Sequence, residues 1–293
     1  MVIDIIIATY RRCDLLAETL TSVQQQTYPN WRCWIAEDGE EPVTREHLAP
    51  FLADSRFRYV PGPHVGSPAR PRNRAIEAGD GELVAILDDD DLWLADKLEK
   101  QVAFLAAHPE CALLGTNGYR WDGSNAPLEC LPIYHRKIPA GRIDVRQMVE
   151  GNCFIASSVL VRRSALATSG LFNENLSPPL GEDYELWLRL AAVGELWFLD
   201  NPLILFREHP PNYYTILNHQ ELTRWKSGIL QAALHGFGVP SPYTRPENRN
   251  LAKIIEEKAA ALKKEPTAWR RTASKLSGIW KAFFSYSCRE PKN

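Results

Sequence analysis

The feature that most constrains this chain is an apolar pentapeptide that runs directly into four consecutive aspartates. Residues 83–87 read Leu-Val-Ala-Ile-Leu, and Asp88, Asp89, Asp90 and Asp91 follow at once. An unbroken apolar run of this length is typical of a strand that is buried on both faces of a parallel sheet. Ligands bind outside the carboxyl ends of such strands, so the sequence predicts a ligand site at the aspartates.

Four adjacent carboxylates repel one another, and a cluster of them beside a buried strand is costly unless water or a cation offsets the charge. Magnesium and manganese favour oxygen ligands, and magnesium often takes only one or two carboxylates from a protein. A divalent metal is the simplest offset, so Mn²⁺ or Mg²⁺ is the expected cofactor. The alternative is a solvated helix N-terminus that is capped by Asp91.

Composition excludes several classes of protein. The 293 residues are 45% apolar and carry a net charge of −2, so the chain can bury a large core and is not a general nucleic-acid binder. The six cysteines contain no C-x-x-C pair, which indicates reduced thiols in a cytosolic protein rather than a zinc site or a disulfide framework. The apolar run at 5–8 is too short for a signal peptide. The sequence also lacks a run of about eighteen apolar residues, which is the length needed to span a membrane.

Strands and helices are predicted to alternate in the first third of the chain. Each strand is a short apolar run, and the helices carry apolar side chains at helical spacing. This alternation is the signature of a doubly wound, mostly parallel α/β sheet flanked by helices. The predicted strands are 2–8, 31–36, 57–60 and 83–87, and the predicted helices are 14–26, 44–53, 70–79 and 94–105.

The pattern is less regular after the fourth helix. Residues 111–114 and 157–161 are predicted strands, and 115–141 is expected to be a variable loop region. A helix is predicted over 181–190, and a further helix over 222–234 is expected to fold back on the body.

Three arginines, Arg70, Arg72 and Arg74, stand at the start of the predicted helix 70–79. Positive charges at this end oppose the helix dipole, so we expect them to bind a negatively charged group outside the helix. Phosphate is the natural partner, because the guanidinium fork matches its oxygens and the helix N-terminus adds free amides. At least one of the three is expected to contact a ligand, and the alternative is a solvated basic turn.

Glu182 and Asp183 open the predicted helix 181–190, directly after Gly181. A carboxylate in such a place can act as a general base. The alternative is a capping role, in which the acidic side chains only satisfy the first turn of the helix.

Together these motifs resemble the inverting glycosyltransferases of the GT-A fold, specifically glycosyltransferase family 2. The resemblance runs from Ile3 to about His209, roughly two thirds of the chain, and its motifs stand in the family's order. Glu37 replaces the first aspartate of the family's acidic turn, whereas Asp38 is kept. The matching segments are 7–11, 37–39, 70–74, 88–91, 182–183, and the pair Arg207 and His209.

The resemblance implies a role for each matched residue. Asp88 is expected to meet the ribose of a nucleotide sugar, Asp90 to bind the metal that bridges the diphosphate, and Asp183 to be the catalytic base. His209 is a second candidate for the metal. The full set expected to bind the nucleotide sugar is Ala8, Tyr10, Arg11, Asp38, Arg70, Arg72, Asn73, Asp88, Asp89, Arg207 and His209.

The acceptor is expected on the side of Asn152, Glu182 and Trp187. Trp93 is a further candidate near the path of the sugar. Aromatic side chains at helical spacing are more often core, so burial is the alternative for both tryptophans.

The function implied is metal-dependent, inverting transfer of a sugar from a nucleoside diphosphate, with uridine favoured, to a hydroxyl of a glycan or lipid-linked acceptor. Polysaccharide, lipopolysaccharide or another cell-surface glycan would be the product. The alternative is a non-catalytic nucleotide-sugar-binding protein, or a nucleotidyltransferase that uses the same acidic metal site. Asp183 favours catalysis, because a binding module needs no base.

We expect a GT-A domain over 1–210, with a nucleotide-sugar half (1–115) and an acceptor half (116–210), followed by a helical extension over 211–293. From residue 249 onward eleven Lys or Arg stand against four Asp or Glu, a balance of +7. Basic amphipathic helices suit contact with an anionic membrane surface, here the cytoplasmic face. Packing on the body and formation of a homodimer are the alternatives.

Overall fold

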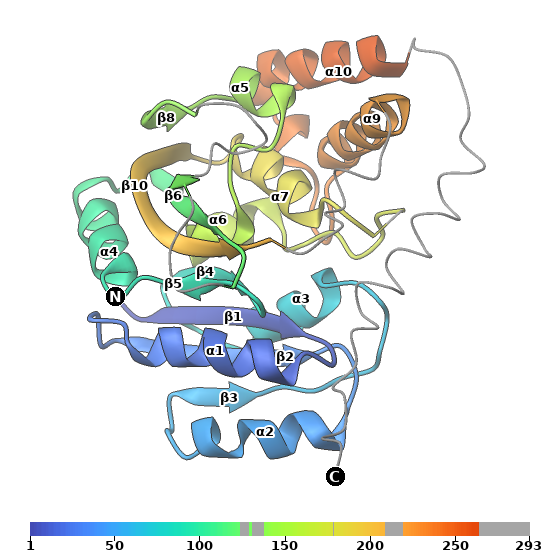
Figure 1. The fold of residues 1–293 in the computed structure, drawn as a ribbon. Helices are drawn as coiled ribbons and strands as arrows, with labels where there is room; N and C mark the ends of the chain where they lie inside the picture. The colour runs from blue at the N-terminus through green and yellow to red at the C-terminus, as the bar shows by residue number, and fades with distance from the viewer. Residues whose placement is uncertain (124–128, 131–137, 178, 209–218, 264–293) are drawn as a thin grey trace.

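The computed structural model describes residues 1–123, 129–130, 138–177, 179–208 and 219–263 (Figure 1). Its first part alternates strands and helices, as the apolar pattern predicts, with ends that differ by up to three residues from the predicted ones. The elements are β1 (Ile3–Thr9), α1 (Cys13–Gln24), β2 (Trp31–Glu37), α2 (Pro42–Leu52), β3 (Phe57–Tyr59), α3 (Ala69–Ala78), β4 (Leu83–Asp88), β5 (Leu92–Trp93) and α4 (Lys97–Ala107).

The second part holds shorter elements and two long strands. Figure 1 shows the last two helices of the described chain at the end of the molecule opposite α2. The elements are β6 (Cys111–Trp121), β7 (Glu129–Cys130), β8 (Gly141–Ile143), α5 (Val145–Glu150), the 3₁₀ turn η2 (Ala156–Ser158), β9 (Leu160–Arg162), α6 (Arg163–Ser169), α7 (Glu182–Leu190), β10 (Glu195–Arg207), α9 (His219–His235), the 3₁₀ turns η3 (Pro242–Thr244) and η4 (Pro246–Asn248), and α10 (Arg249–Lys263).

Two expectations about this second part are wrong. β6 continues through residues 115–121, which are expected to be loop. Its glycines stand at positions where close neighbours leave no room for a side chain. A Cβ at Gly115 would lie 2.3 Å from Phe154, and one at Gly118 would lie 2.5 Å from Ile204. Glycine thus marks tight packing here rather than a turn. The expected strand at 157–161 begins as the 3₁₀ turn η2, and only β9 continues it.

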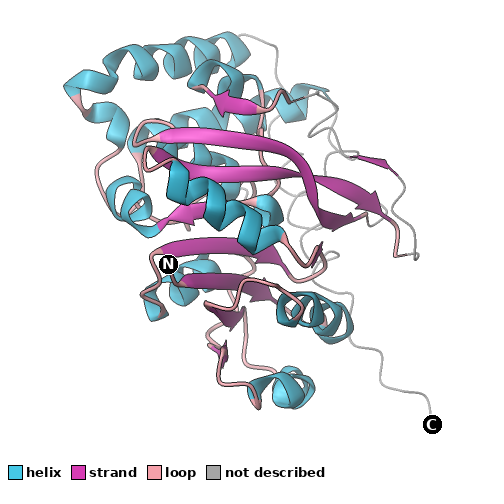
Figure 2. Ribbon diagram, turned by 90° about the vertical axis from the view of Figure 1, so that its left-hand side faces the viewer, coloured by secondary structure: helices cyan, strands magenta, loops and turns pink. Residues whose placement is uncertain are grey.

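The strands form one mixed sheet in the order β3-β2-β1-β4-β9-β6-β10-β5, with β7 paired to β6 and β8 paired to β10. The strands β3, β2, β1 and β4 are parallel. β9 is antiparallel to both of its neighbours, β4 and β6, and therefore joins the two halves. Figure 2 shows the twisted sheet with helices on both sides, the arrangement expected of an α/β layer.

The core is divided into two parts by the sheet, because successive side chains of a strand point to opposite faces. In β1, Ile5 and Ile7 belong to the cluster that contains Leu16 of α1, whereas Ile6 belongs to the cluster that contains Ile76 of α3. Each strand is therefore apolar on both faces, which explains the unbroken apolar runs in the sequence.

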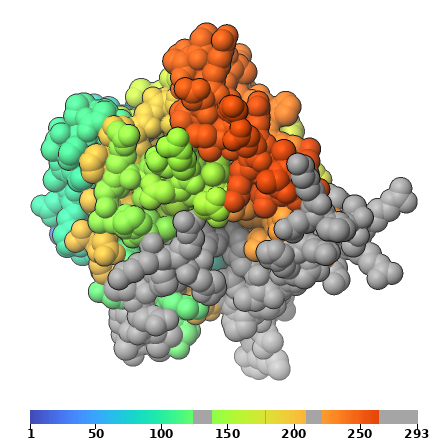
Figure 3. Space-filling view, turned by 90° about the horizontal axis from the view of Figure 1, so that it is seen from above, coloured from blue at the N-terminus to red at the C-terminus, as the bar shows by residue number. Residues whose placement is uncertain are grey.

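The described helices of the C-terminal extension pack on the body. Leu230 and Ala233 of α9 and Ile255 and Ala259 of α10 are buried in the same cluster as α7. Figure 3 shows α10 lying beside α5 and β8 on the face seen from above. Residues 264–293, which carry most of the basic amphipathic pattern, lie outside the described residues. Within the described part of the chain, no helix combines the length and the apolarity needed to cross a bilayer.

A fully buried ion pair ties α7 to the end of α6. Arg189 donates to Glu185 Oε1 at 2.9 Å and Oε2 at 2.6 Å, and to the carbonyl oxygens of Ser169 and Leu171 at 2.5 and 2.6 Å. Both charged side chains have no exposed surface. A buried charge that loses its partner is strongly destabilising, so this pair fixes how α7 lies against the sheet.

Replacing Arg189→Met should lower the free energy of unfolding by about 3–5 kcal/mol, because Glu185 is left buried without its counterion. The double change Glu185→Leu with Arg189→Met should recover a substantial part of this loss. Urea titration of the three proteins gives the comparison. A double variant that is no more stable than the single one would show that the two charges do not compensate each other.

Candidate active site

The carboxyl ends of three neighbouring parallel strands meet at one edge of the sheet. Backbone pairing sets Thr9 of β1 beside Glu37 of β2, and Ala8 of β1 beside Asp88 of β4. The loops that leave these strands therefore start from one place. Residues 88–91 lie at this edge, where the sequence predicts a ligand site.

Asp89 and Asp90 share one guanidinium group. Arg12 Nη1 lies 3.0 Å from Asp89 Oδ1 and 2.7 Å from Asp90 Oδ2, and the Thr9 hydroxyl donates to Asp89 Oδ2 at 2.8 Å. Burial raises the pKa of Asp89 to about 6; the charge of Arg12 opposes this rise, and the charge of Asp90 adds to it. The two carboxylates and Arg12 form a nearly buried cluster of charges.

The buried carboxylate of Asp91 connects η2 to the end of β10. Its Oδ2 accepts the Ser157 hydroxyl at 2.5 Å, and its Oδ1 accepts the backbone N–H of Arg207 at 2.9 Å. Burial raises the pKa of Asp91 well above its ordinary value, and the charges of Asp90 and Asp88 add to the rise. Because β5 follows directly and α4 begins only after it, the alternative of a solvated helix capped by Asp91 is wrong.

Arg72 joins the aspartates to α7. Its Nη2 donates to Asp88 Oδ1 at 2.6 Å, and its Nη1 donates to Glu182 Oε1 at 2.5 Å. Burial acts to lower the pKa of Arg72, but the charges of Asp88 and Glu182 outweigh it and raise the pKa above its ordinary value. The guanidinium also lies 5.3 Å from the ring centre of Phe172. One buried arginine therefore holds carboxylates from both halves of the chain.

Asp183 stands beside this bridge in the first turn of α7. Burial raises its pKa to about 7, and the charge of Glu182 adds to the rise, whereas Arg72 opposes it. Asn152 donates its side-chain amide to Asp183 Oδ2 at 2.9 Å, and the Asn152 carbonyl oxygen accepts the Phe154 N–H at 3.1 Å. The amide thus orients a carboxyl group that is close to half ionised at neutral pH.

Of the three arginines in α3, Arg72 is the one that joins this cluster. Arg70 is about half exposed and donates to Glu174 at 2.9 Å. Arg74 turns the other way and donates to the carbonyl oxygen of Glu37 at 2.5 Å. The basic start of α3 is therefore only partly directed at the sheet edge.

Asn73 ties α3 to the loop before α7. Its side-chain amide donates to the carbonyl oxygen of Phe172 at 2.8 Å and to Glu174 at 2.9 Å, and its own oxygen accepts the Phe172 N–H at 2.9 Å. The side chain is 4% exposed. These bonds place Phe172 beside Arg72, so Asn73 helps to fix the position of the Arg72 side chain.

Asp38 holds the loop that leads into α3. Its Oδ1 accepts the Val65 N–H at 2.8 Å, and its Oδ2 accepts the Gly66 N–H at 2.7 Å and lies 3.0 Å from His64 Nδ1. Gly66 has φ +70°, a backbone conformation that favours glycine. The Asp38 carboxylate therefore fixes the position of His64.

Tyr10 stacks on His64 at the outer end of this loop. The ring centres are 4.3 Å apart, and the planes differ by 16°. Arg11 lies over the other part of the Tyr10 ring, 5.1 Å from its centre, and donates to Glu41 at 2.8 and 2.5 Å. Tyr10 and His64 are both partly exposed, so they form an aromatic surface beside the aspartates.

Glu37 takes the first acidic position before Asp38, and its side chain is fully buried. It accepts hydrogen bonds from the Thr44 hydroxyl at 2.5 Å, from the Glu41 N–H at 3.1 Å and from the Tyr59 hydroxyl. The longer side chain reaches inward to α2 and β3, so Glu37 has a structural role in this protein.

Arg207, at the end of β10, contacts the aspartates. Its Nε donates to the carbonyl oxygen of Asp90 at 2.9 Å, and its Nη2 donates to Glu18 at 2.6 Å. The guanidinium lies 4.1 Å from the ring centre of Trp121. His209, the other member of this predicted pair, lies outside the described residues.

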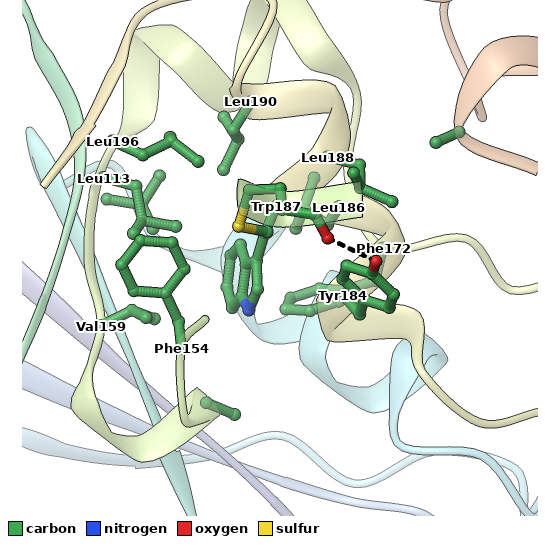
Figure 4. Close-up of a cluster of buried hydrophobic side chains, with 14 of the residues drawn as sticks. Leu113, Phe154, Val159, Phe172, Tyr184, Leu186, Trp187, Leu188, Leu190 and Leu196 are labelled. Carbon is green, nitrogen blue, oxygen red and sulfur yellow. Dashed lines mark hydrogen bonds between the residues drawn. The ribbon is translucent and has the colours of Figure 1, made fainter. Parts of the chain in front are cut away.

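The expectation that Trp187 lies on the acceptor side is corrected by its burial. Its side chain has no exposed surface, and its ring packs edge-to-face against Phe172 with centres 6.1 Å apart. Figure 4 shows Trp187 surrounded by apolar side chains, because helical spacing directs it into the core. Trp93 is also buried, and it donates to the carbonyl oxygen of Ser157 at 2.8 Å.

The cluster has the charge that a divalent metal would offset. Six carboxyl groups gather here (Asp88, Asp89, Asp90, Asp91, Glu182 and Asp183), and hydrogen bonds join four of them (Asp88, Asp89, Asp90 and Glu182) to the guanidinium groups of Arg12 and Arg72. Within the described residues, His, Cys, Asp and Glu side chains do not form a group of three or more that could hold a metal. Magnesium sites commonly use one or two carboxylates and complete their shell with substrate phosphates and water. The Asp90 carboxylate, which Arg12 binds at 2.7 Å, is an oxygen ligand of the kind that such a partial site uses.

Two residues of the cluster were not singled out from the sequence. Arg12 belongs to a pair of arginines that directly follows the first strand, and this pair was the available signal. Ser157 binds both Asp91 and the backbone N–H of Asp88. It reaches them only through the fold, so no local pattern could have indicated it.

Residues 4–170 match the family model described as glycosyl transferase family 2. WfgD of Escherichia coli, a UDP-Glc:alpha-D-GlcNAc-diphosphoundecaprenol beta-1,3-glucosyltransferase, is 32% identical over 196 residues, which cover 66% of this chain and 71% of WfgD. An uncharacterized glycosyltransferase of Rickettsia conorii is 29% identical over 201 residues, which cover 69% of this chain but 32% of that protein. The chain therefore spans about a third of the longer relative.

Among solved structures, residues 1–349 of S. aureus TarS in complex with UDP match with a TM-score of 0.64 and 17% identity, over 88% of this chain and 70% of that chain. This likeness confirms the predicted GT-A fold. The family model covers more than half of the chain and includes the aspartates at the end of β4. The chain belongs to glycosyltransferase family 2.

Proposed function

We propose that this protein transfers a sugar from a nucleoside diphosphate sugar to an acceptor hydroxyl and inverts the anomeric configuration. The proposal rests on the two ion pairs of Arg72. They hold Asp88, at the end of β4, close to Glu182, at the start of α7. A group suited to the donor and a group suited to the acceptor thus meet in one cluster. Membership of the family supports the same activity.

Asp183 is the proposed general base. Its pKa of about 7 is close to the pH at which the enzyme works in a cell, which is the condition for efficient proton transfer. The acceptor hydroxyl gives its proton to Asp183 as its oxygen attacks the anomeric carbon from the face opposite the diphosphate. Asn152 holds Oδ2 of Asp183 in place during this step. A single displacement of this kind inverts the configuration.

The diphosphate leaving group needs positive charge. Asp90 is proposed to hold Mn²⁺ or Mg²⁺, which when bound would neutralise the charge that develops on the diphosphate, and Asp88 is proposed to meet the ribose. Arg12 and Arg207 add fixed positive charge at the same edge, because both donate to residues of the acidic run. The excess of carboxyl groups over guanidinium groups supports a metal at this place.

The proposed sugar donor carries a uridine nucleotide. The name of WfgD gives UDP-glucose as its donor, and TarS has been solved in complex with UDP. The stacked rings of Tyr10 and His64 offer a flat aromatic surface for a base at the edge of the aspartate cluster. Asp38 supports that surface through His64.

A lipid-linked glycan is the proposed acceptor, and a cell-surface polysaccharide is the proposed product. WfgD acts on a diphosphoundecaprenol-linked sugar by its name. The positive balance of the sequence from residue 249 onward suits a protein that works at the anionic cytoplasmic face of a membrane.

A thermal-shift screen tests the proposal directly. The purified protein is heated with nucleoside diphosphates and nucleotide sugars, each with and without Mn²⁺. A ligand at a hundred times its dissociation constant adds about 2.7 kcal/mol of stability, which for a chain of 293 residues corresponds to a shift of about 4–5 °C. A metal-dependent shift in the uridine series is expected. A folded sample that responds to none of the ligands would contradict the proposal.

Asp90→Ala should abolish the metal-dependent part of donor binding, because the proposed metal loses its main protein ligand. Isothermal titration with UDP, in the presence and absence of Mn²⁺, measures this part separately. The Glu46→Ala variant, which changes an exposed carboxylate on α2, is the matched control and should behave like the wild type. Donor binding that keeps its full dependence on Mn²⁺ in Asp90→Ala would refute the assignment.

Asp183→Asn should reduce kcat by about a hundredfold or more while donor affinity stays nearly unchanged, because the base acts only in the transition state. Initial rates and a titration with the donor give the two quantities. An equal loss of both would speak against Asp183 as the base.

The rate should depend on pH through Asp183. The base acts when it is deprotonated, so kcat/KM should rise with pH and level off above a pKa of about 7. Glu182→Gln removes a neighbouring negative charge that raises this pKa, so the rise should move to lower pH. Rates measured from about pH 5 to 9 show the shift, and Glu46→Gln is the control. A profile that stays in place in Glu182→Gln would exclude Asp183 as the titrating group.

A further inference from the structure

Arg12 stands where the proposed function needs a metal. We propose that Arg12 and a divalent metal compete for Asp90: the Arg12 guanidinium neutralises this carboxylate, and a metal that binds there has to displace it. The inference rests on the proposed function in one respect, namely that Asp90 is a metal ligand. It adds a regulatory role for a residue outside the motifs that carry the family resemblance.

The contact between Arg12 and the carboxylates is close and shielded from water. The same nitrogen, Nη1, donates to Asp90 Oδ2 at 2.7 Å and to Asp89 Oδ1 at 3.0 Å. The side chain of Arg12 is 13% exposed, and those of Asp90 and Asp89 are 13% and 8% exposed. Ion pairs in such surroundings are much less screened than those at the surface. Arg12 therefore contributes a fixed positive charge at the oxygen that a metal would use.

The backbone of Arg12 begins α1, because its carbonyl oxygen accepts the Leu16 N–H at 3.0 Å, but its side chain does not cap the helix. Arg12 directly precedes the first residue of α1. A positive charge at this end opposes the helix dipole. The acidic cluster, rather than α1, therefore accounts for an arginine at this position.

The neighbouring arginine takes a different direction. Arg11 has φ +55°, in the left-handed region that non-glycine residues seldom adopt. Its side chain pairs with Glu41 and is 47% exposed. The backbone turn at Arg11 thus sends one arginine outward and the next one inward, so the pair offers a built-in comparison of the two positions.

The bond to Asp89 would keep Arg12 in the cluster when a metal binds. A metal that takes the Asp90 carboxylate would displace the bond from Arg12 Nη1 to Asp90 Oδ2, and the bond from Nη1 to Asp89 Oδ1 would hold the guanidinium nearby. Asp89 is held in place by the Thr9 hydroxyl at 2.8 Å. Arg12 therefore weakens the binding of metal alone, and metal binding in turn weakens the bond from Arg12 to Asp90, as linkage requires.

Titration with Mn²⁺ alone, followed by the electron paramagnetic resonance signal of free Mn²⁺, tests the inference without activity. Arg12→Met keeps the buried aliphatic stem and removes the charge, so it should bind Mn²⁺ about tenfold more tightly than the wild type. Arg11→Met makes the same change of charge one residue away and should leave the affinity within about twofold, since an exposed charge is screened.

Unchanged or weaker Mn²⁺ binding in Arg12→Met would overturn the inference, because it would show that Arg12 orients Asp90 for the metal instead of competing with it. Thermal melting checks that the variant is folded. If it is not folded, Arg12→Lys decides the question. Arg12→Lys keeps the positive charge on a shorter reach of donors, so Mn²⁺ should bind as it does to the wild type or at most a few times more tightly, and clearly weaker binding would overturn the inference.

The wild type and Asp90→Ala separate this inference from the proposed function. Mn²⁺ binding by the wild type that Asp90→Ala abolishes supports the metal site, and the Arg12 variants then test the competition alone. Absence of such binding in the wild type, together with tight binding in Arg12→Met, would support the competition in its strongest form. Absence of binding in both would refute Asp90 as a metal ligand and, with it, the competition.

Discussion

The arrangement of the site depends on the two ion pairs of Arg72. A buried guanidinium needs partners within hydrogen-bond distance, and Arg72 finds them in Asp88 and Glu182. This requirement places α3, the end of β4 and the start of α7 within the reach of one side chain. Asn73 adds to it by binding the backbone of Phe172, whose ring lies against the Arg72 guanidinium. The first and the second part of the chain are thus held together by charge at the point where the chemistry is proposed to occur.

The same cluster concentrates more negative charge than a stable fold would favour. Burial and mutual repulsion raise the pKa values of Asp89, Asp91 and Asp183, and each raised value means that the ionised form is disfavoured there. Hydroxyl groups from Thr9 and Ser157 and the guanidinium of Arg12 reduce this cost but do not remove it. A site of this kind is poised to take up a cation and a proton, which are the two species that sugar transfer to a hydroxyl has to manage.

The position of the site could be predicted from the sequence, whereas most of its internal contacts could not. An apolar run followed by acid is a local pattern, so the end of β4 could be recognised, and the family resemblance supplied the α/β fold. The partners of Asp91 lie 66 and 116 positions away, and no local pattern encodes such distances. Helical spacing places Trp187 on the buried face of α7, and its complete burial agrees with that spacing rather than with the expected contact to the acceptor. The glycines of β6 weakened the strand pattern, although close neighbours rather than a turn require them.

The antiparallel strand β9 has a consequence for how the protein is made. It fills the place between β4 and β6, and its residues come late, after the whole of both partners. Until about residue 162 has left the ribosome, β4 has one unpaired edge, and its apolar side chains lack part of their cover. Unpaired strand edges are a common cause of aggregation in nascent chains. The acidic run that follows β4 places like charges at one end of that edge, which discourages pairing with another chain during synthesis.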